Sequence, residues 1–153
     1  LGYTTTRTKI FETREALING ASEVDMVVNI SAVKDKRWDH VREDIQEVAE
    51  ITENYTFKII FETCYLNETE IKKLAQIGTE IEGVDFIKTS TGFGPKGATV
   101  NHVKLISEIA GSDTRVKAAG GIRSLADFKE MIAAGASRIG TSSGVAIVKE
   151  CQQ

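Results

Sequence analysis

The sequence is poor in the residues that build disulfide-bonded and metal-binding proteins: its 153 residues include two cysteines and two histidines. Cys64 and Cys151 fit neither a disulfide framework nor a metal-binding motif, and two histidines are too few for a typical Cys/His zinc site. The sequence therefore predicts no metal site, and we expect a reduced protein located in the cytoplasm.

Long hydrophobic runs and blocks of one charge are also missing. The longest apolar stretches are about five residues, far below the roughly 18 needed to cross a bilayer, and no signal-peptide pattern opens the chain. The net charge of -3 is spread over residues of both signs without a basic block. The electrostatic footprint of a nucleic-acid-binding protein is therefore absent. We expect no membrane or nucleic-acid partner, whereas a small anionic ligand is compatible with this composition.

What the sequence does contain is a regular alternation of two kinds of segment. Short β-rich segments, each bounded by turn residues, predict strands at 23–30, 57–63, 83–90, 115–121 and 137–143. Amphipathic segments of helical period precede, separate and follow them, at 5–19, 37–54, 67–82, 99–110, 124–134 and in a short segment from 143. Strand followed by helix at this spacing is typical of parallel βα units, in which helices cover the sheet.

Two α/β architectures are built from such units, an open doubly wound sheet and a closed barrel of eight strands. The hydrophobic content of 41% and the charged content of 27% fit one globular domain. Five strands cannot close an eight-stranded barrel, and the chain begins on a predicted helix rather than a strand. We therefore expect residues 1–153 to belong to a single βα domain that is incomplete at its N-terminus.

Four of the predicted strands each carry one ionisable residue within an otherwise apolar segment, namely Asp25, Lys58, Lys88 and Lys117. Any one of these side chains could lie at the solvent end of a short strand. Side chains alternate between the two faces of a strand, however, and charged groups in a sheet covered by helices need partners. The four residues together indicate a convergent polar site.

Neighbouring lysines in such a site predict nucleophilic chemistry. Two ammonium groups in a dry cavity disfavour each other's charge, so one amine loses its proton near neutral pH and becomes a nucleophile. A lysine at the end of a strand, as in Lys88, therefore suits imine formation with a carbonyl substrate. Asp25 would balance the charge and move protons. Glu62 shares a strand face with Lys58, and we expect these two residues to pair inside the core.

Stretches rich in glycine and hydroxyl groups follow three of the predicted strands, at 89–97, 118–124 and 140–144. Glycine lets the backbone turn with its N–H groups exposed, and a helix that begins at Ser124 or after Ser143 presents its N-terminus to an anion. The last two stretches follow the final two strands, where βα-barrels usually bind a phosphate group. Neither has the spacing of a P-loop. Together they predict a phosphate site.

Five stretches in order and spacing resemble the deoxyribose-phosphate aldolases, a family of Schiff-base aldolases on a (β/α)8 barrel: GASEVDMVVNI, KIIFETC, GVDFIKTSTGFGPKGAT, VKAAGGIR and AGASRIGTSSG. The resemblance runs over essentially the whole chain, and FIKTSTG together with VKAAGGIR is a specific combination. Family members carry three more strands before the helix that opens this sequence. The resemblance thus implies a TIM barrel of which this chain covers about the last five βα units, with the first strands missing.

The resemblance also implies a lyase of deoxyribonucleotide catabolism that reversibly cleaves 2-deoxy-D-ribose 5-phosphate into D-glyceraldehyde 3-phosphate and acetaldehyde, without metal or organic cofactor. Lys88 would form the imine, Lys117 would lower the pKa of Lys88, and Asp25 would belong to a proton relay through water. Lys58 is a secondary candidate. The residues that would bind the substrate and its phosphate group are Thr91, Gly92, Gly120, Gly121, Ser142 and Ser143.

Other hypotheses stay open. The protein could be a different Schiff-base aldolase, or a phosphate-binding barrel isomerase in which Lys88 acts electrostatically and never forms a covalent bond. Alternatively, the 153-residue chain by itself could be a non-catalytic half-barrel that associates with a second copy to cover its strand edges. We expect a homo-oligomer, with a dimer favoured, and a small phosphorylated sugar as the substrate.

Overall fold

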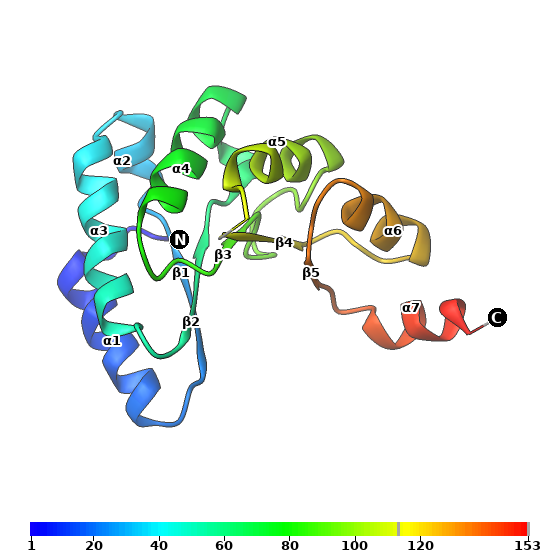
Figure 1. Ribbon diagram of the computed structural model, residues 1–153, viewed down its shortest axis with the longest axis horizontal. Helices are drawn as coiled ribbons and strands as arrows, with labels where there is room; N and C mark the ends of the chain where they lie inside the picture. Colours follow the sequence, from blue (N-terminus) through cyan, green and yellow to red (C-terminus); the bar gives the residue numbers. More distant parts are fainter. Residues whose placement is uncertain (113, 153) are drawn as a thin grey trace.

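The computed structural model describes residues 1–112 and 114–152, and its centre is a parallel sheet (Figure 1). The sheet consists of β1 (Glu23–Val27), β2 (Thr56–Ile60), β3 (Phe86–Lys88), β4 (Arg115–Ala119) and β5 (Arg138–Gly140). These strands lie side by side in chain order, and each is parallel to its neighbours. Because crossovers between parallel strands share one handedness, this order puts the connecting helices on one side of the sheet. It is the topology of a βα-barrel, whereas a doubly wound sheet reverses its strand order.

Helices lie at all the places where the alternation predicts them: α1 (Thr6–Ile18), α3 (Trp38–Ile51), α4 (Glu68–Glu80), α5 (Val100–Ala110), α6 (Leu125–Ala133) and α7 (Gly144–Cys151). Two short elements were not predicted, α2 (Ile30–Lys34) and the 3-10 turn η1 (Thr63–Tyr65). None of the helices in the described part of the chain is both long and apolar enough to cross a membrane. The predicted fold class, α/β of the TIM-barrel type, is confirmed.

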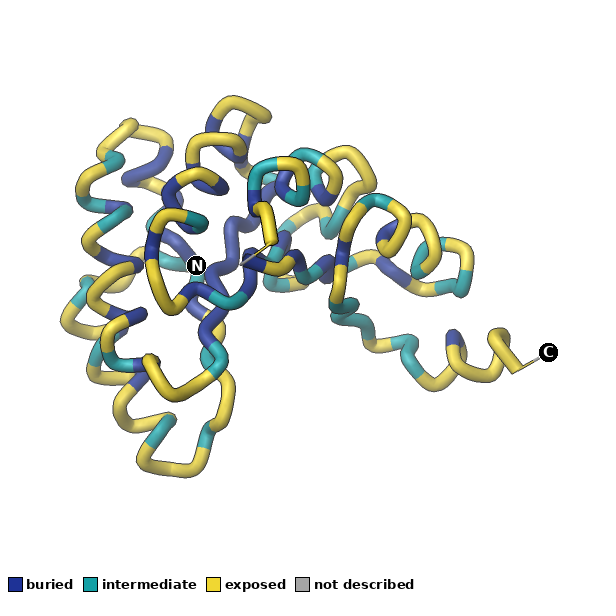
Figure 2. Tube along the Cα trace, viewed as in Figure 1, coloured by how far each residue is buried: buried dark blue, intermediate teal, exposed yellow. Residues whose placement is uncertain are grey.

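The two faces of the sheet differ in chemistry. One face packs against the helices, and its buried side chains are Met26, Phe57, Ile59, Ile87, Val116 and Ala118. Each large aliphatic or aromatic side chain buried in this way contributes about 1.5–3 kcal/mol. Figure 2 shows buried residues along the strands and exposed residues on the outer sides of the helices. The strand register sends every alternate residue to the opposite, inner face, which carries the charged side chains of the sheet.

The strands are shorter than predicted because the chain turns away at their carboxyl ends. The first was expected to reach residue 30, but Asn29 leaves the sheet and caps α2, where it accepts a hydrogen bond from the N–H of Ala32 at 3.1 Å. The second ends at Ile60, and Glu62 adopts a left-handed backbone conformation with a φ of 53°. These turns bring polar side chains to the carboxyl edge of the sheet, where the predicted site lies.

Candidate active site

The inner face of the sheet holds the four ionisable residues singled out in the sequence. The register pairs Asp25 with Lys58 on β1 and β2, and Lys88 with Lys117 on β3 and β4. Residues paired across neighbouring strands point to the same face. The structure therefore brings these four side chains together from four consecutive strands.

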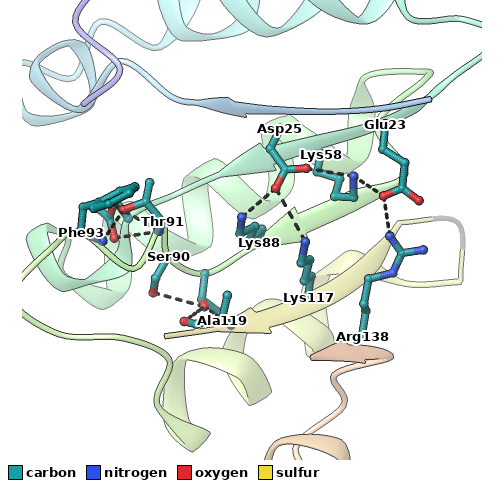
Figure 3. A network of polar contacts seen from close by, with 12 residues as sticks. Glu23, Asp25, Lys58, Lys88, Ser90, Thr91, Phe93, Lys117, Ala119 and Arg138 are labelled. Atoms are coloured by element: carbon teal, nitrogen blue, oxygen red, sulfur yellow. Dashed lines mark hydrogen bonds and ion pairs between the residues drawn. The ribbon is translucent and has the colours of Figure 1, made fainter. Parts of the chain in front are cut away.

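Asp25 lies at the centre of this cluster, and all three lysines form ion pairs with its carboxylate (Figure 3). The Nζ atoms of Lys88 and Lys117 lie 2.7 Å and 3.7 Å from Oδ2. The Nζ atom of Lys58 lies 2.9 Å from Oδ1. The side chains of Lys88 and Lys117 are 13% and 17% exposed, and that of Lys58 is 1% exposed, so Lys88 and Lys117 are the accessible amines of the cluster.

The contacts set the charge of the central groups. Burial alone would raise the pKa of Asp25, but hydrogen bonds from Lys88 and Lys58 and the charges of Lys88 and Lys117 lower it from 3.8 to about 2. For Lys117, burial is the largest effect and lowers the pKa; attraction to Asp25 opposes this change, and repulsion by Lys88 and Lys58 adds to it. Asp25 is therefore a carboxylate at neutral pH, and Lys117 gives up its proton more easily than an ordinary lysine.

A second carboxylate, Glu23, extends the cluster and was not predicted. It lies 2.6 Å from Nζ of Lys58 and 2.7 Å from the guanidinium group of Arg138 (Figure 3). The hydrogen bond from Lys58 is the largest cause of a lowered pKa for Glu23. Lys58 thus has two carboxylate partners, as a buried ammonium group requires. The two-residue period of the strand could have identified Glu23, because Glu23 and Asp25 are two residues apart on one strand and face the same side.

The expected pair between Glu62 and Lys58 is wrong. Four residues along a strand separate two Cα atoms by about 13 Å, and Glu62 has left the strand in its left-handed conformation. The buried carboxylate of Glu62 instead accepts hydrogen bonds from the N–H of Thr91, at 3.2 and 3.3 Å, and from the Thr91 hydroxyl group. These bonds fix Thr91 three residues after Lys88.

The loop after β3 is held against β4 as well. The hydroxyl group of Thr89 donates to the carbonyl of Ala119 at 3.2 Å and accepts from the N–H of the same residue at 3.1 Å. Farther along the loop, a Cβ atom on Gly97 would lie 2.1 Å from the carbonyl oxygen of Gly120. Only glycine fits at this close approach. The loop after β3 therefore packs directly on the loop after β4.

The predicted phosphate residues lie in the loops after β4 and β5. Gly120 and Gly121 have φ values of 84° and 81°, which favour glycine. The hydroxyl group of Thr141 donates to the carbonyl of Ile122 at 2.6 Å and so joins the two loops. Ser143 caps α7 without a side-chain hydrogen bond. The N–H groups at the start of this helix are therefore suited to meet an anion.

The start of α6 does not match the expectation of an anion site. Asp127 accepts hydrogen bonds from the N–H of Arg123 at 2.9 Å and of Ser124 at 3.0 Å. The helix thus supplies its own carboxylate at this end. Ser142 lies in the loop after β5, and Gly92, with a φ of 98°, lies in the loop after β3. Within residues 1–112 and 114–152, no group of three or more histidine, cysteine, aspartate or glutamate residues is placed to hold a metal ion.

The arrangement as a whole combines two accessible amines, one of which has a lowered pKa, and a carboxylate. Nucleophilic attack on a carbonyl group needs an amine, and the proton transfers that follow need groups that exchange protons near the operating pH. The inner face therefore has the groups required for imine chemistry.

Comparisons with known proteins agree with this chemistry. The family model described as "DeoC/LacD family aldolase" matches residues 2–151. The sequence is 51% identical over 149 residues to deoxyribose-phosphate aldolase 1 of Staphylococcus aureus (strain MRSA252), and the alignment covers 97% of this chain and 67% of that protein. The solved structure described as "QR15, an Aldolase" is 49% identical, with a TM-score of 0.92, over 99% of this chain and 68% of that chain.

A further solved structure, the deoxyribose phosphate aldolase from Aeropyrum pernix, is described as a unique tetramer. It is 29% identical to this chain, with a TM-score of 0.88, over 100% of this chain and 64% of that one. The chain thus spans 64% to 68% of the length of these three relatives. With a family match from residue 2 to residue 151, the chain belongs to the DeoC/LacD family of aldolases.

Proposed function

We propose that the protein is an aldolase that reversibly cleaves 2-deoxy-D-ribose 5-phosphate into D-glyceraldehyde 3-phosphate and acetaldehyde, through an imine on Lys88. One observation carries the proposal: amines from neighbouring strands, Lys88 and Lys117, meet at the same carboxylate oxygen of Asp25. The membership of the aldolase family and the name of the Staphylococcus aureus relative support this substrate.

In the cleavage direction, Nζ of Lys88 attacks the C1 carbonyl of the open-chain sugar, and water leaves to give an imine. Removal of the proton from the C3 hydroxyl group breaks the C2–C3 bond, so that D-glyceraldehyde 3-phosphate departs and the electron pair stays in an enamine. Protonation of the enamine at C2 and hydrolysis of the imine release acetaldehyde and the free amine. We assign the proton transfers to Lys117, whose pKa is lowered, and to a relay through water that includes Asp25. Lys58 would hold Asp25 in place.

The phosphate group would bind at the loops after β4 and β5, and the substrate would pass along the loop after β3. The residues proposed for these contacts are Gly120, Gly121, Ser142 and Ser143 for the phosphate group, and Thr91 and Gly92 for the path. The proposed reaction needs no metal or organic cofactor.

The organisation of the protein is part of the proposal. Residues 1–153 would form one portion of a single βα-barrel domain that is incomplete at the N-terminus. We expect a homo-oligomer and favour a dimer, although the Aeropyrum pernix relative is described as tetrameric. A cytoplasmic location is proposed from the cysteine content, since both Cys64 and Cys151 are free thiols.

The direct test is to trap the imine. The protein, expressed from its complete coding sequence, is incubated with acetaldehyde and borohydride, and the adduct is located by mass spectrometry. We expect modification of Lys88 and none in the Lys88→Arg variant. An adduct at another residue, or no adduct, contradicts the proposal. Turnover that survives borohydride treatment in the presence of substrate would instead favour the isomerase hypothesis.

The 153-residue chain can be assayed separately for the half-barrel hypothesis. A tight oligomer in size-exclusion chromatography without retro-aldol activity would support a non-catalytic half-barrel. A monomer with full activity would exclude it.

A further inference from the structure

Glu62 is a buried carboxylate that the proposed reaction does not use. Its exposed fraction is 0%, and its backbone is left-handed, with φ and ψ of 53° and 59°. Such a conformation is strained for a residue other than glycine. Burial of a carboxylate is also unfavourable unless hydrogen bonds compensate for the lost water. Two unfavourable features coincide in one residue beside the candidate active site, and its contacts explain why it is there.

The thiol group of Cys64 donates to Oε1 of Glu62 at 4.0 Å, and the other compensating hydrogen bonds come from the loop that follows Lys88. The N–H of Thr91 donates to both carboxylate oxygens of Glu62, at 3.2 and 3.3 Å, and the Thr91 hydroxyl group donates to Oε2. The N–H of Phe93 in turn donates to Oγ1 of Thr91 at 3.0 Å. Both the backbone and the side chain of Thr91 are therefore fixed, while the residue itself is only half-buried.

The hydroxyl group of threonine has one hydrogen to donate and two lone pairs that accept. In Thr91 the hydrogen is committed to Glu62, and one lone pair accepts from Phe93. One acceptor position is left. Thr91 in this state can receive a hydrogen bond from a hydroxyl group, but it cannot donate one to a carbonyl or ether oxygen.

We propose that Glu62 is a positioning residue: it fixes the loop after Lys88 and makes Thr91 a hydrogen-bond acceptor for a hydroxyl group of the substrate. The inference rests on the proposed function, because it concerns the recognition of the sugar that the aldolase cleaves. Acetaldehyde carries no hydroxyl group. Imine formation between Lys88 and acetaldehyde is therefore independent of Glu62, whereas cleavage of the phosphorylated sugar depends on it.

The experiment measures these two reactions in the same variants. In Glu62→Gln, we expect kcat/KM for 2-deoxy-D-ribose 5-phosphate to fall about 10- to 100-fold, the range typical for loss of a hydrogen bond to a charged group. The rate of borohydride trapping with acetaldehyde is expected to stay within about twofold of wild type, since a bond to a hydroxyl group is not involved. A purely structural role would reduce both reactions together.

Thr91 variants test whether Glu62 acts through this residue. Thr91→Ser keeps the hydroxyl group and is expected to retain most of the activity, whereas Thr91→Val is expected to lose as much as Glu62→Gln. If the two residues act as one unit, the double variant Glu62→Gln/Thr91→Val is no worse than Thr91→Val alone. Losses that multiply would show that Glu62 does not act through Thr91 and would overturn the inference.

Thr52→Val is a matched control for stability. Thr52 is 1% exposed at the end of α3, and its hydroxyl group is 3.0 Å from the carbonyl oxygens of Val48 and Ala49. This variant loses buried hydrogen bonds at the end of α3, at a residue that is not part of the candidate active site. We therefore expect a lower Tm with unchanged kcat/KM. If the Glu62→Gln variant cleaves the sugar as well as wild type does, the positioning role is refuted and the proposed function is not affected. A wild-type protein without adduct or turnover refutes the proposed function, and the inference with it.

Discussion

Replacing Asp25 by asparagine removes the carboxylate on which three ammonium groups converge, and the structure sets the size of the effect. The pKa of Asp25 falls from 3.8 to about 2 in the folded protein. At about 1.4 kcal/mol for each pH unit, this difference corresponds to roughly 2.5 kcal/mol. Solvent reaches 28% of the side chain, and screening reduces the contribution to about 1.5 kcal/mol. We expect Asp25→Asn to lower the free energy of unfolding at pH 7 by this amount.

The pH dependence gives the prediction its sign. Because the folded pKa lies below the unfolded value, the contribution of Asp25 is present above pH 4 and is lost as the pH falls towards 2. Urea denaturation of wild type and Asp25→Asn from pH 7 to pH 3 measures the gap between their free energies of unfolding directly. By pH 3 the gap should be about half its value at pH 7. A gap that is constant over this range, or absent at pH 7, would show that the lysines do not stabilise the carboxylate.

The remaining predictions concern the amines and the packed loops. Lys88→Arg keeps the positive charge beside Asp25, so we expect loss of turnover and of the borohydride adduct, with the unfolding free energy within about 1 kcal/mol of wild type in urea denaturation. Burial lowers the pKa of Lys117 below its unfolded value of 10.5. The free energy of unfolding of wild type relative to that of Lys117→Met should therefore rise between pH 7 and pH 10. A difference that stays flat or falls over this range would contradict the prediction. Gly97→Ala would place a methyl group 2.1 Å from the carbonyl oxygen of Gly120, and we expect about 1–3 kcal/mol of destabilisation in thermal unfolding and weaker inhibition by inorganic phosphate.

The elements and the charged cluster could be predicted because both follow from simple periods. Alternating strands and helices predict parallel βα units, and the two-residue period of a strand predicts which side chains share a face. The strand register places Asp25, Lys58, Lys88 and Lys117 at positions whose side chains all point to the inner face of the sheet.

The role of Glu62 could not be predicted in the same way. Side chains alternate between two faces only within a strand, and the left-handed turn after Ile60 ends this alternation. The partner of Glu62 lies 29 residues away, in a loop without a repeating pattern. The sequence shows a carboxylate near a lysine of its own strand, and pairing with Lys58 is then the natural but wrong choice. A loop partner of this kind becomes visible only when the ends of neighbouring strands are placed in space.

The contact between Glu23 and Arg138 shows why the site depends on the whole sheet. These residues lie on β1 and β5, which a flat sheet with strands about 4.8 Å apart would separate by roughly 19 Å. The guanidinium group of Arg138 nevertheless lies 2.7 Å from the Glu23 carboxylate. The sheet must therefore curve around its inner face, as the wall of a barrel does. The same curvature brings Lys117 on β4 within 3.7 Å of Asp25 on β1, three strands away. The ion pair between Lys117 and Asp25 is thus a consequence of barrel curvature. Any change that flattens the sheet would leave every catalytic candidate in the chain but separate this amine from its carboxylate.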